Sequence, residues 1–188
     1  MKAILISIKP EWVAKILNGE KTIEIRKTMP KCDLPIDVYI YCTKQNDLFK
    51  SYIRMGYYTT RSTADDLSYN GKGKVVAKFT LNKVGEVKQI QTDNWFIEIR
   101  KGIIDKVIAS TPTILEKSCL TYEELNSYLK GKNGYAWHID NLVIFDRPKE
   151  LNEFKKRNGC MDFQGYVKYL YEPLTKAPQS WQFVESEK

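Results

Sequence analysis

The chain opens with an apolar run and then with apolar side chains at helical spacing. Residues Ala3–Ile8 are almost entirely apolar, which predicts a buried strand. Pro10 suits the first turn of a helix, because its missing N–H would have no partner there. The apolar positions that share one face of this helix are Trp12, Val13, Ile16 and Leu17.

The period changes from helical to alternating after Gly19. A glycine is the natural left-handed residue at the end of a helix, and a period of two follows it. Ile23 and Ile25 occupy one side of the alternation. The other side carries Thr22, Glu24 and Arg26. This pattern predicts a half-buried strand with a carboxylate and a guanidinium together on its polar face.

Further strands and one further helix are predicted downstream. Thr121 and Glu124 have the spacing of a capping box, so a helix should begin there and run to Leu129, closed by Gly131. Residues 95–108 fit either a helix or a strand. The predicted strands are Ile36–Cys42, Lys74–Leu81, Tyr135–Phe145 with a bend around Asp140–Asn141 and an end at Pro148, and a last short strand after a loop that begins at Leu174.

The segment at about 44–72 lacks this periodicity and is rich in Ser, Thr, Asn and Gly. We interpret it as an excursion from the core, helical in part near Leu48–Arg54. No repeat or linker divides the rest. The prediction is therefore one α+β domain over residues 1–188.

Composition narrows the class of partner. Lys and Arg number 30 against 23 Asp and Glu, so the formal charge of +7 favours a polyanion such as RNA or DNA, with a solvated basic surface as an equal alternative. The four cysteines form no CxxC pair, so no metal site and no cofactor is expected. No leader or membrane-length apolar run is visible, which predicts a cytoplasmic protein with reduced thiols and buried cysteines.

Lys21, Glu24 and Arg26 form the most informative candidate site. The ammonium and guanidinium can bind phosphate, and the carboxylate can accept from a base amino group. A surface ion pair on an exposed strand face is the alternative, and spacing alone favours that alternative.

Three pieces of the chain resemble ASCH-domain proteins of phage and Firmicute type. The first is Ile8–Trp12 with Ile16–Lys27, in which a Gly-x-Lys element is followed five residues after the lysine by Arg26. The second and third are Gly134–Ile139 and Lys176–Trp181. The resemblance implies a PUA-like mixed β-barrel flanked by a few helices, with Lys21 and Arg26 facing a cleft beside the first helix.

The resemblance implies RNA binding, which is known for related folds, and two possible activities found in some ASCH proteins, ribonuclease and amidohydrolase of acetylated cytidine. The amidohydrolases use a Lys, a Thr three residues later and a distant Glu. Lys21 matches the lysine, Glu24 stands at the threonine position, and Glu86 is one candidate for the distant acid. Lys21 and Glu24 would be the catalytic pair if the protein is an enzyme, but the missing threonine counts against this chemistry.

The remaining ligand-binding candidates come from the same three pieces of sequence. They are Lys9, Trp137, His138, Gln179, Ser180 and Trp181. A core role is favoured for Trp137, and His138 is a possible general base or an ordinary hydrogen-bonded residue. Trp181, in a loop with polar neighbours, suits base stacking as well as a core or lid role.

Three functions remain open at this point. The first is a module that binds RNA, single-stranded nucleic acid or a nucleotide; the second is a hydrolase at the same place; the third is a protein-interaction adaptor. The basic balance favours the first two, and the single histidine favours binding over catalysis, since metal-free cleavage of RNA usually needs two acid–base groups.

Overall fold

The computed structural model describes residues 2–44, 52–54, 57–59, 69–89, 94–101, 104–163 and 166–185. The chain divides into two compact units. The first comprises Met1–Leu17, Ile36–Phe79 and Leu142–Lys188, and the second Asn18–Pro35 and Thr80–Asn141. The expectation of a single domain over 1–188 stays a prediction.

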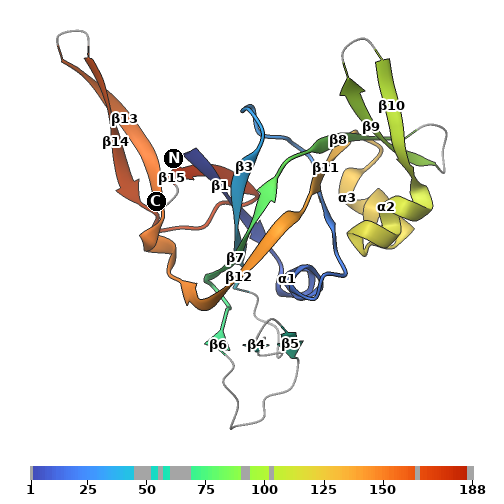
Figure 1. The fold of residues 1–188 in the computed structure, drawn as a ribbon, viewed down its shortest axis with the longest axis horizontal. Helices are drawn as coiled ribbons and strands as arrows, with labels where there is room; N and C mark the ends of the chain where they lie inside the picture. The colour runs from blue at the N-terminus through green and yellow to red at the C-terminus, as the bar shows by residue number, and fades with distance from the viewer. Residues whose placement is uncertain are drawn as a thin grey trace. The chain divides into compact units, whose positions relative to one another are not determined.

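The first unit is built on a seven-stranded sheet (Figure 1). The strand order is β12-β7-β3-β1-β15-β13-β14. The strands are β1 (Lys2–Ile8), β3 (Ile36–Cys42), β7 (Val75–Leu81), β12 (Asp140–Lys149), β13 (Lys155–Phe163), β14 (Tyr166–Pro173) and β15 (Trp181–Glu185). A short 3-10 helix, η1 (Leu151–Glu153), precedes β13.

Strand β1 lies in the middle of this sheet, which explains its continuous apolar sequence. It pairs in parallel with β3 and antiparallel with β15. Ala3 to Ile6 are fully buried, because both faces of the strand are covered. One face contributes Ala3 and Leu5 to a core cluster in which the rings of Tyr39 and Phe154 meet edge to face at 4.9 Å.

The first unit also holds one helix and a small sheet. Helix α1 (Pro10–Leu17) begins at Pro10 and buries Val13, Ile16 and Leu17, as the spacing predicted, whereas Trp12, expected on the same face, is only half-buried. The small sheet has the order β5-β4-β6 and consists of β4 (Tyr52–Arg54), β5 (Tyr57–Thr59) and β6 (Tyr69–Asn70). The helix expected near Leu48–Arg54 is wrong where it can be judged, because Tyr52–Arg54 is a strand; residues 48–51 lie outside the described residues.

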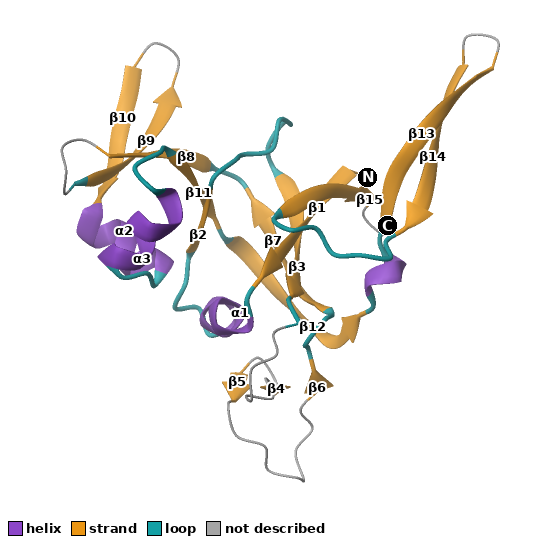
Figure 2. Ribbon diagram, turned by 180° about the vertical axis from the view of Figure 1, so that it is seen from behind, coloured by secondary structure: helices purple, strands orange, loops and turns teal. Residues whose placement is uncertain are grey.

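The second unit is a five-stranded antiparallel sheet with two helices (Figure 2). The strand order is β10-β9-β8-β11-β2, so β2 is an edge strand. The elements are β2 (Ile23–Arg26), β8 (Val84–Gln89), β9 (Trp95–Lys101), β10 (Ile104–Ser110), α2 (Thr111–Ser118), α3 (Tyr122–Leu129) and β11 (Gly134–His138).

The helices cover the face of the sheet that carries Ile23 and Ile25. Ile114 of α2 and Leu125 and Leu129 of α3 are buried in the same cluster. Trp95 connects the sheet to both helices, because its indole N–H donates to Asn126 at 2.8 Å and its backbone N–H donates to Thr111 at 2.7 Å. Other buried members of the cluster are Val87, Ile97 and Ala136.

Most local predictions from the sequence are confirmed. Gly19 is left-handed at φ +76°, and both hydrogen bonds of the Thr121–Glu124 capping box are present. The left-handed turn after α3 begins at Lys130, one residue before the expected glycine. The strand predicted from Tyr135 to Phe145 is two strands, β11 and β12, separated by Ile139. Asn141, the second residue of β12, is left-handed at φ +49°, where the bend was expected.

Other expectations need correction or completion. Of the ambiguous residues 95–108, residues 95–101 lie in strand β9 and residues 104–108 in strand β10, while 102–103 lie outside the described residues. Strand β12 continues through Pro148 to Lys149. The strand orders of the described residues are those of open sheets, so a mixed α+β fold is present but closure into a barrel is not confirmed. Strand β8, helix α2 and the β13–β14 pair had no counterpart among the sequence predictions.

Candidate ligand-binding site

Lys21, Glu24 and Arg26 come together at the edge strand β2 of the second unit. One carboxylate oxygen of Glu24 lies 3.2 Å from Nζ of Lys21, and the other lies 3.0 Å from Nη2 of Arg26. Glu24 and Arg26 are two residues apart in a strand, so their side chains leave the same face. Lys21, just before the strand, reaches the opposite side of the carboxylate. Glu24 therefore bridges two cations.

A second anchor holds Lys21 at the end of helix α2. Its Nζ donates to the backbone carbonyl of Ser118 at 2.6 Å, and the N–H of Thr22 donates to the carbonyl of Lys117 at 2.9 Å. Carbonyl groups in the last turn of a helix lack partners within the helix, and a cation there is favourable. The position of the ammonium is thus fixed by two elements.

The cluster is buried, which corrects the expectation of a half-buried strand with a polar face. Lys21 is 2% exposed, and Glu24 and Arg26 are each 7% exposed. Charges are costly to bury unless they are paired, and the two contacts of Glu24 meet that need. Two cations and one carboxylate sum to +1, so the three side chains together carry an excess positive charge.

Tyr128 of helix α3 extends the cluster toward the surface. Its hydroxyl hydrogen-bonds with the side chain of Arg26 and with the backbone of Lys27, and Nζ of Lys27 lies 4.9 Å from the centre of its ring. Burial raises the pKa of this phenol; the charge of Glu24 also raises it, while Arg26 and the Lys27 hydrogen bond lower it. The residue is nevertheless 37% exposed. Tyr128 therefore offers an accessible ring next to two cations.

Sequence reasoning missed Tyr128 and Ser118 because both join the cluster through tertiary contacts. The one available signal was the capping box, which fixes the residue at which helix α3 begins and therefore which of its side chains share a face. With Leu125 and Leu129 facing the core, Tyr128 lies at the border of the apolar face. An aromatic residue at such a border is a candidate for contact with a ligand.

Trp137 and His138 lie on β11, the strand that pairs with β2. Trp137 is opposite Glu24 and is fully buried, as expected for the core role. His138 is opposite Ile23, so it points to the other face. Burial lowers its pKa, as do the charges of Lys83 and Lys117, whereas Asp140 raises it. Its Nε2 is buried without a hydrogen-bond partner among the described residues.

The other four candidates belong to the first unit. Gln179 and Ser180 precede β15, and the carbonyl of Ser180 accepts from the N–H of Ser7 at 2.9 Å. Trp181 is the first residue of β15, so the expectation that it lies in a loop is wrong. The Trp181 ring meets Phe183 edge to face at 5.6 Å. Lys9 forms an exposed pair with Glu11 at 3.9 Å. These four residues belong to the first unit, whereas the cluster at β2 belongs to the second.

Glu86 and the cysteines do not join the cluster either. Glu86 on β8 accepts from Asn133 at 3.0 Å and lies 3.5 Å from Lys88. Cys42 is buried, and burial raises the pKa of its thiol to about 12, but Cys160 is exposed, contrary to the expectation of buried cysteines.

Within the described part of the chain, no group of three His, Cys, Asp or Glu side chains could hold a metal ion. No helix there is long and apolar enough to cross a membrane.

Fold and cluster together define a class: a small α+β protein with a buried Lys–Glu–Arg group at a sheet edge, next to an exposed tyrosine. The chain belongs to the ASCH domain family, whose model matches residues 6–153. A comparison with curated proteins gives no match.

Solved structures support the same fold. The crystal structure of ASCH from Zymomonas mobilis has a TM-score of 0.52 at 16% identity, covering 97% of this chain and 87% of that chain. Two mutant forms of the same protein, ZmASCH, have TM-scores of 0.50 and 0.51 at 15% identity. They cover 98% and 97% of this chain and 91% and 88% of theirs. At such low identity the likeness concerns the fold alone.

Proposed function

We propose that this ASCH protein binds RNA or another single-stranded nucleic acid, or a nucleotide unit of it, at the Lys21–Glu24–Arg26 cluster. Tyr128 and Lys27 form the accessible entrance. The observation that carries the proposal is the single carboxylate held between two cations beside an exposed aromatic ring. This arrangement supplies partners for both parts of a nucleotide, the phosphate and the base.

The phosphate would be bound at the surface by Lys27, which is exposed. Behind it, the buried Lys21 and Arg26 exceed Glu24 by one positive charge. This excess charge would favour a phosphate at the entrance, because opposite charges attract more strongly near a protein interior than in water. The chain's formal charge of +7 would attract the polyanion over a longer range.

The base would stack on Tyr128. Stacking on an aromatic side chain contributes about 1–3 kcal/mol per base and suits single strands, because their bases are unpaired. Trp137 is less suited than Tyr128, since it is fully buried. The proposal thus moves the stacking role from Trp137 and Trp181 to Tyr128.

Binding without hydrolysis fits the contacts better than catalysis. Nζ of Lys21 donates to Ser118, and each oxygen of Glu24 contacts a cation, so neither side chain is arranged as a general base. His138 points to the opposite face of the sheet from Glu24. We therefore expect negligible release of cytidine from N4-acetylcytidine. Chromatography of the reaction mixture measures the free cytidine. Turnover by the unmodified protein that Lys21→Ala abolishes would instead establish the hydrolase alternative.

The binding test is fluorescence anisotropy with a labelled single-stranded RNA over a range of salt concentrations. The logarithm of the association constant should fall linearly with the logarithm of salt, because phosphate contacts release counterions. Tyr128→Ala should weaken binding by about 1–3 kcal/mol. Lys27→Ala should reduce the salt slope by about one.

A matched control separates this site from general basic attraction. Lys132→Ala removes the same charge as Lys27→Ala from an exposed position after helix α3. Its affinity should stay close to that of the unmodified protein. Equal losses in both lysine variants, with no effect of Tyr128→Ala, would place binding elsewhere on the surface.

A further inference from the structure

The β13–β14 hairpin of the first unit carries an unusual share of exposed apolar side chains. Nine large hydrophobic side chains are exposed among the described residues, and five of them lie on these two strands. Val167 is 54% exposed and Met161 53%. The other three are Tyr169, Leu170 and Tyr171. A cluster of this kind in a protein surface marks an interaction site.

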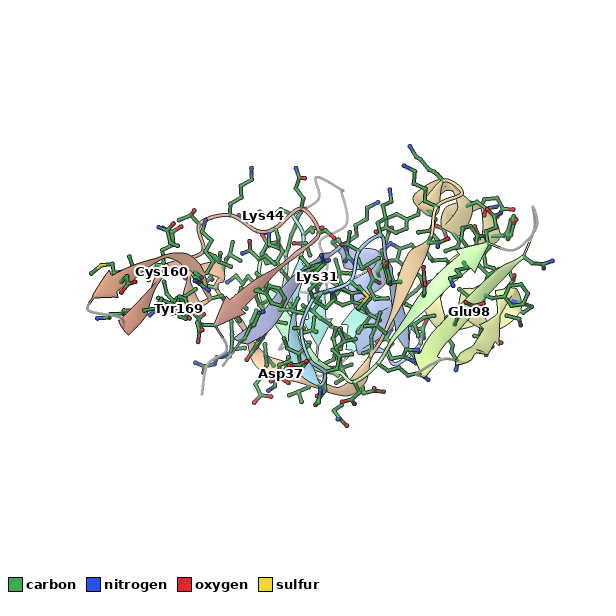
Figure 3. All side chains as sticks on the ribbon, turned by 90° about the horizontal axis from the view of Figure 1, so that it is seen from above. Lys31, Asp37, Lys44, Glu98, Cys160 and Tyr169 are labelled. Carbon is green, nitrogen blue, oxygen red and sulfur yellow. The ribbon has the colours of Figure 1, made fainter. Side chains whose placement is uncertain are left out.

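The register of the hairpin assigns these side chains to its two faces. Cys160 is opposite Tyr169, and both are labelled in Figure 3. Arg157 is opposite Tyr171, so by the register all four share one face. The guanidinium of Arg157 lies 3.5 Å from the centre of the Tyr169 ring. The other face carries Met161, Lys168, Leu170, Lys156 and Glu172. Both faces are thus partly apolar.

Strand β14 is the last strand of its sheet. It pairs with β13, and the strand order places no described strand beyond it (Figure 1). Alternate backbone N–H and C=O groups of an edge strand point outward without a strand partner. An edge of eight residues with exposed apolar side chains is a template for another strand.

Strand β14 carries two opposite charges placed symmetrically about Leu170, so an antiparallel second copy of the strand would pair them. Lys168 and Glu172 lie two residues to either side of Leu170. Lys168 takes part in no ion pair among the described residues. Glu172 lies 3.0 Å from Lys156 of β13 and accepts from Asn158 at 2.5 Å.

We propose that two copies of the chain associate through antiparallel pairing of their β14 strands, centred on Leu170. In this register Lys168 of each copy is opposite Glu172 of the other, and Tyr169 is opposite Tyr171. The two leucines meet at the centre. Cross-strand pairs of opposite charge and pairs of aromatic rings are both stabilising, and the two-fold symmetry supplies each pair twice. The two seven-stranded sheets become one sheet of fourteen strands.

The same charges disfavour another register. Pairing centred on Lys168 would place the two lysines opposite each other, which is unfavourable. Lys168 therefore favours one register over the other, because it lies opposite a lysine in the alternative register and opposite Glu172 in the proposed one. A lysine in an edge strand normally prevents pairing, and here the self-complementary register removes that obstacle.

A protein partner fits this hairpin better than nucleic acid. Interfaces with nucleic acid are polar and strongly basic, whereas here five apolar or aromatic side chains are exposed. The polar atoms beside the tyrosines are also engaged within the unit, because Arg157 stacks on Tyr169 and the Tyr171 hydroxyl hydrogen-bonds to Glu185.

The first test is the mass of the chain in solution, measured by light scattering or sedimentation over a series of concentrations. The dimer has a mass of 43.8 kDa, twice the 21.9 kDa of one chain. Lys168→Glu places a carboxylate opposite Glu172 in both symmetry-related pairs. Its dimer dissociation constant should rise by roughly tenfold or more.

Mixing two variants gives a sharper test. Glu172→Lys should also weaken self-association, since it places two lysines opposite each other. A mixture of the Lys168→Glu chain with the Glu172→Lys chain restores opposite charges at both pairs, so a heterodimer should form where each variant alone is mainly monomeric. Circular dichroism of each variant verifies that it is folded.

Three results would overturn the proposal. One is a monomeric unmodified chain at every concentration, and another is a dimer whose dissociation constant is unchanged in Lys168→Glu. The third is monomeric protein in which Tyr169→Ala weakens RNA binding, because the hairpin would then contact nucleic acid. None of these results depends on the ligand site at β2.

Discussion

Glu24 is the residue on which the geometry of the cluster depends. Its carboxylate contacts both Lys21, at 3.2 Å, and Arg26, at 3.0 Å. Removing it would leave Lys21 and Arg26 buried next to each other. Loss of one partner from a buried ion pair costs about 3–5 kcal/mol, far more than loss of an exposed pair.

Glu24→Ala should therefore lower the free energy of unfolding by about 3–5 kcal/mol in denaturant titrations. The control is Glu11→Ala, which removes the exposed partner of Lys9 and should cost less than about 1 kcal/mol. Similar small losses in both variants would mean that the cluster is hydrated rather than buried.

His138 makes a separate prediction about pH. Its pKa is lowered in the fold, mainly by burial, with Lys83 and Lys117 acting in the same direction and Asp140 opposing them. Below the ordinary value of 6.5, the unfolded chain takes up a proton that the folded chain still excludes. Stability should thus be complete above that pH and fall as the pH drops toward the lowered pKa of the folded state.

Denaturant titrations between about pH 8 and about pH 5 measure this loss. The unmodified protein should lose stability below about pH 6.5, and His138→Gln should lose less over the same range. Equal slopes for the two proteins would assign the pH dependence to other groups.

Local sequence patterns predicted the elements well, because they depend on neighbours along the chain. The alternation from Thr22 to Arg26, the glycine at 19 and the capping box at Thr121 all acted as expected. The burial of Glu24 and Arg26 was not predictable, because an alternating pattern does not reveal what covers its polar face. The contact of Lys21 with Ser118 joins residues 97 positions apart and leaves no local signal.

Gly134 shows how closely three elements of the second unit approach. A Cβ added at this first residue of β11 would lie 2.6 Å from Cδ2 of Leu129 in α3 and 3.2 Å from the carbonyl oxygen of Arg26 in β2. The leucine side chain is fully packed in the core, so it has little space to move.

Gly134→Ala should therefore destabilise the protein by about 1–3 kcal/mol, the usual cost of overpacking. The control is the double variant Gly134→Ala/Leu129→Ala, which removes the Cδ atoms of Leu129 that the added Cβ would meet. If the Cβ meets the Leu129 side chain, Gly134→Ala should lower the free energy of unfolding less in the Leu129→Ala chain than in the unmodified chain. Equal effects in the two chains would contradict this contact.

At the scale of the whole molecule, membership of the ASCH family and the excess of positive charge both favour the proposed nucleic-acid ligand. The family model covers residues 6–153, and the cluster and Tyr128 lie within that range. The β13–β14 hairpin lies beyond it. The proposed pairing of two chains is thus a feature of this chain's C-terminal part, separate from the proposed ligand site.

The central claim is that a base of single-stranded RNA lies against Tyr128 while its phosphate contacts Lys27, next to the buried cations of the cluster. The most direct measurement is photo-crosslinking of the full chain to an RNA containing 4-thiouridine, with the crosslinked peptide identified by mass spectrometry. The account predicts crosslinks at Tyr128 or within residues 21–27, reduced in Tyr128→Ala and unchanged in Lys132→Ala. Crosslinks confined to other parts of the chain, the hairpin at residues 155–173 included, would contradict it.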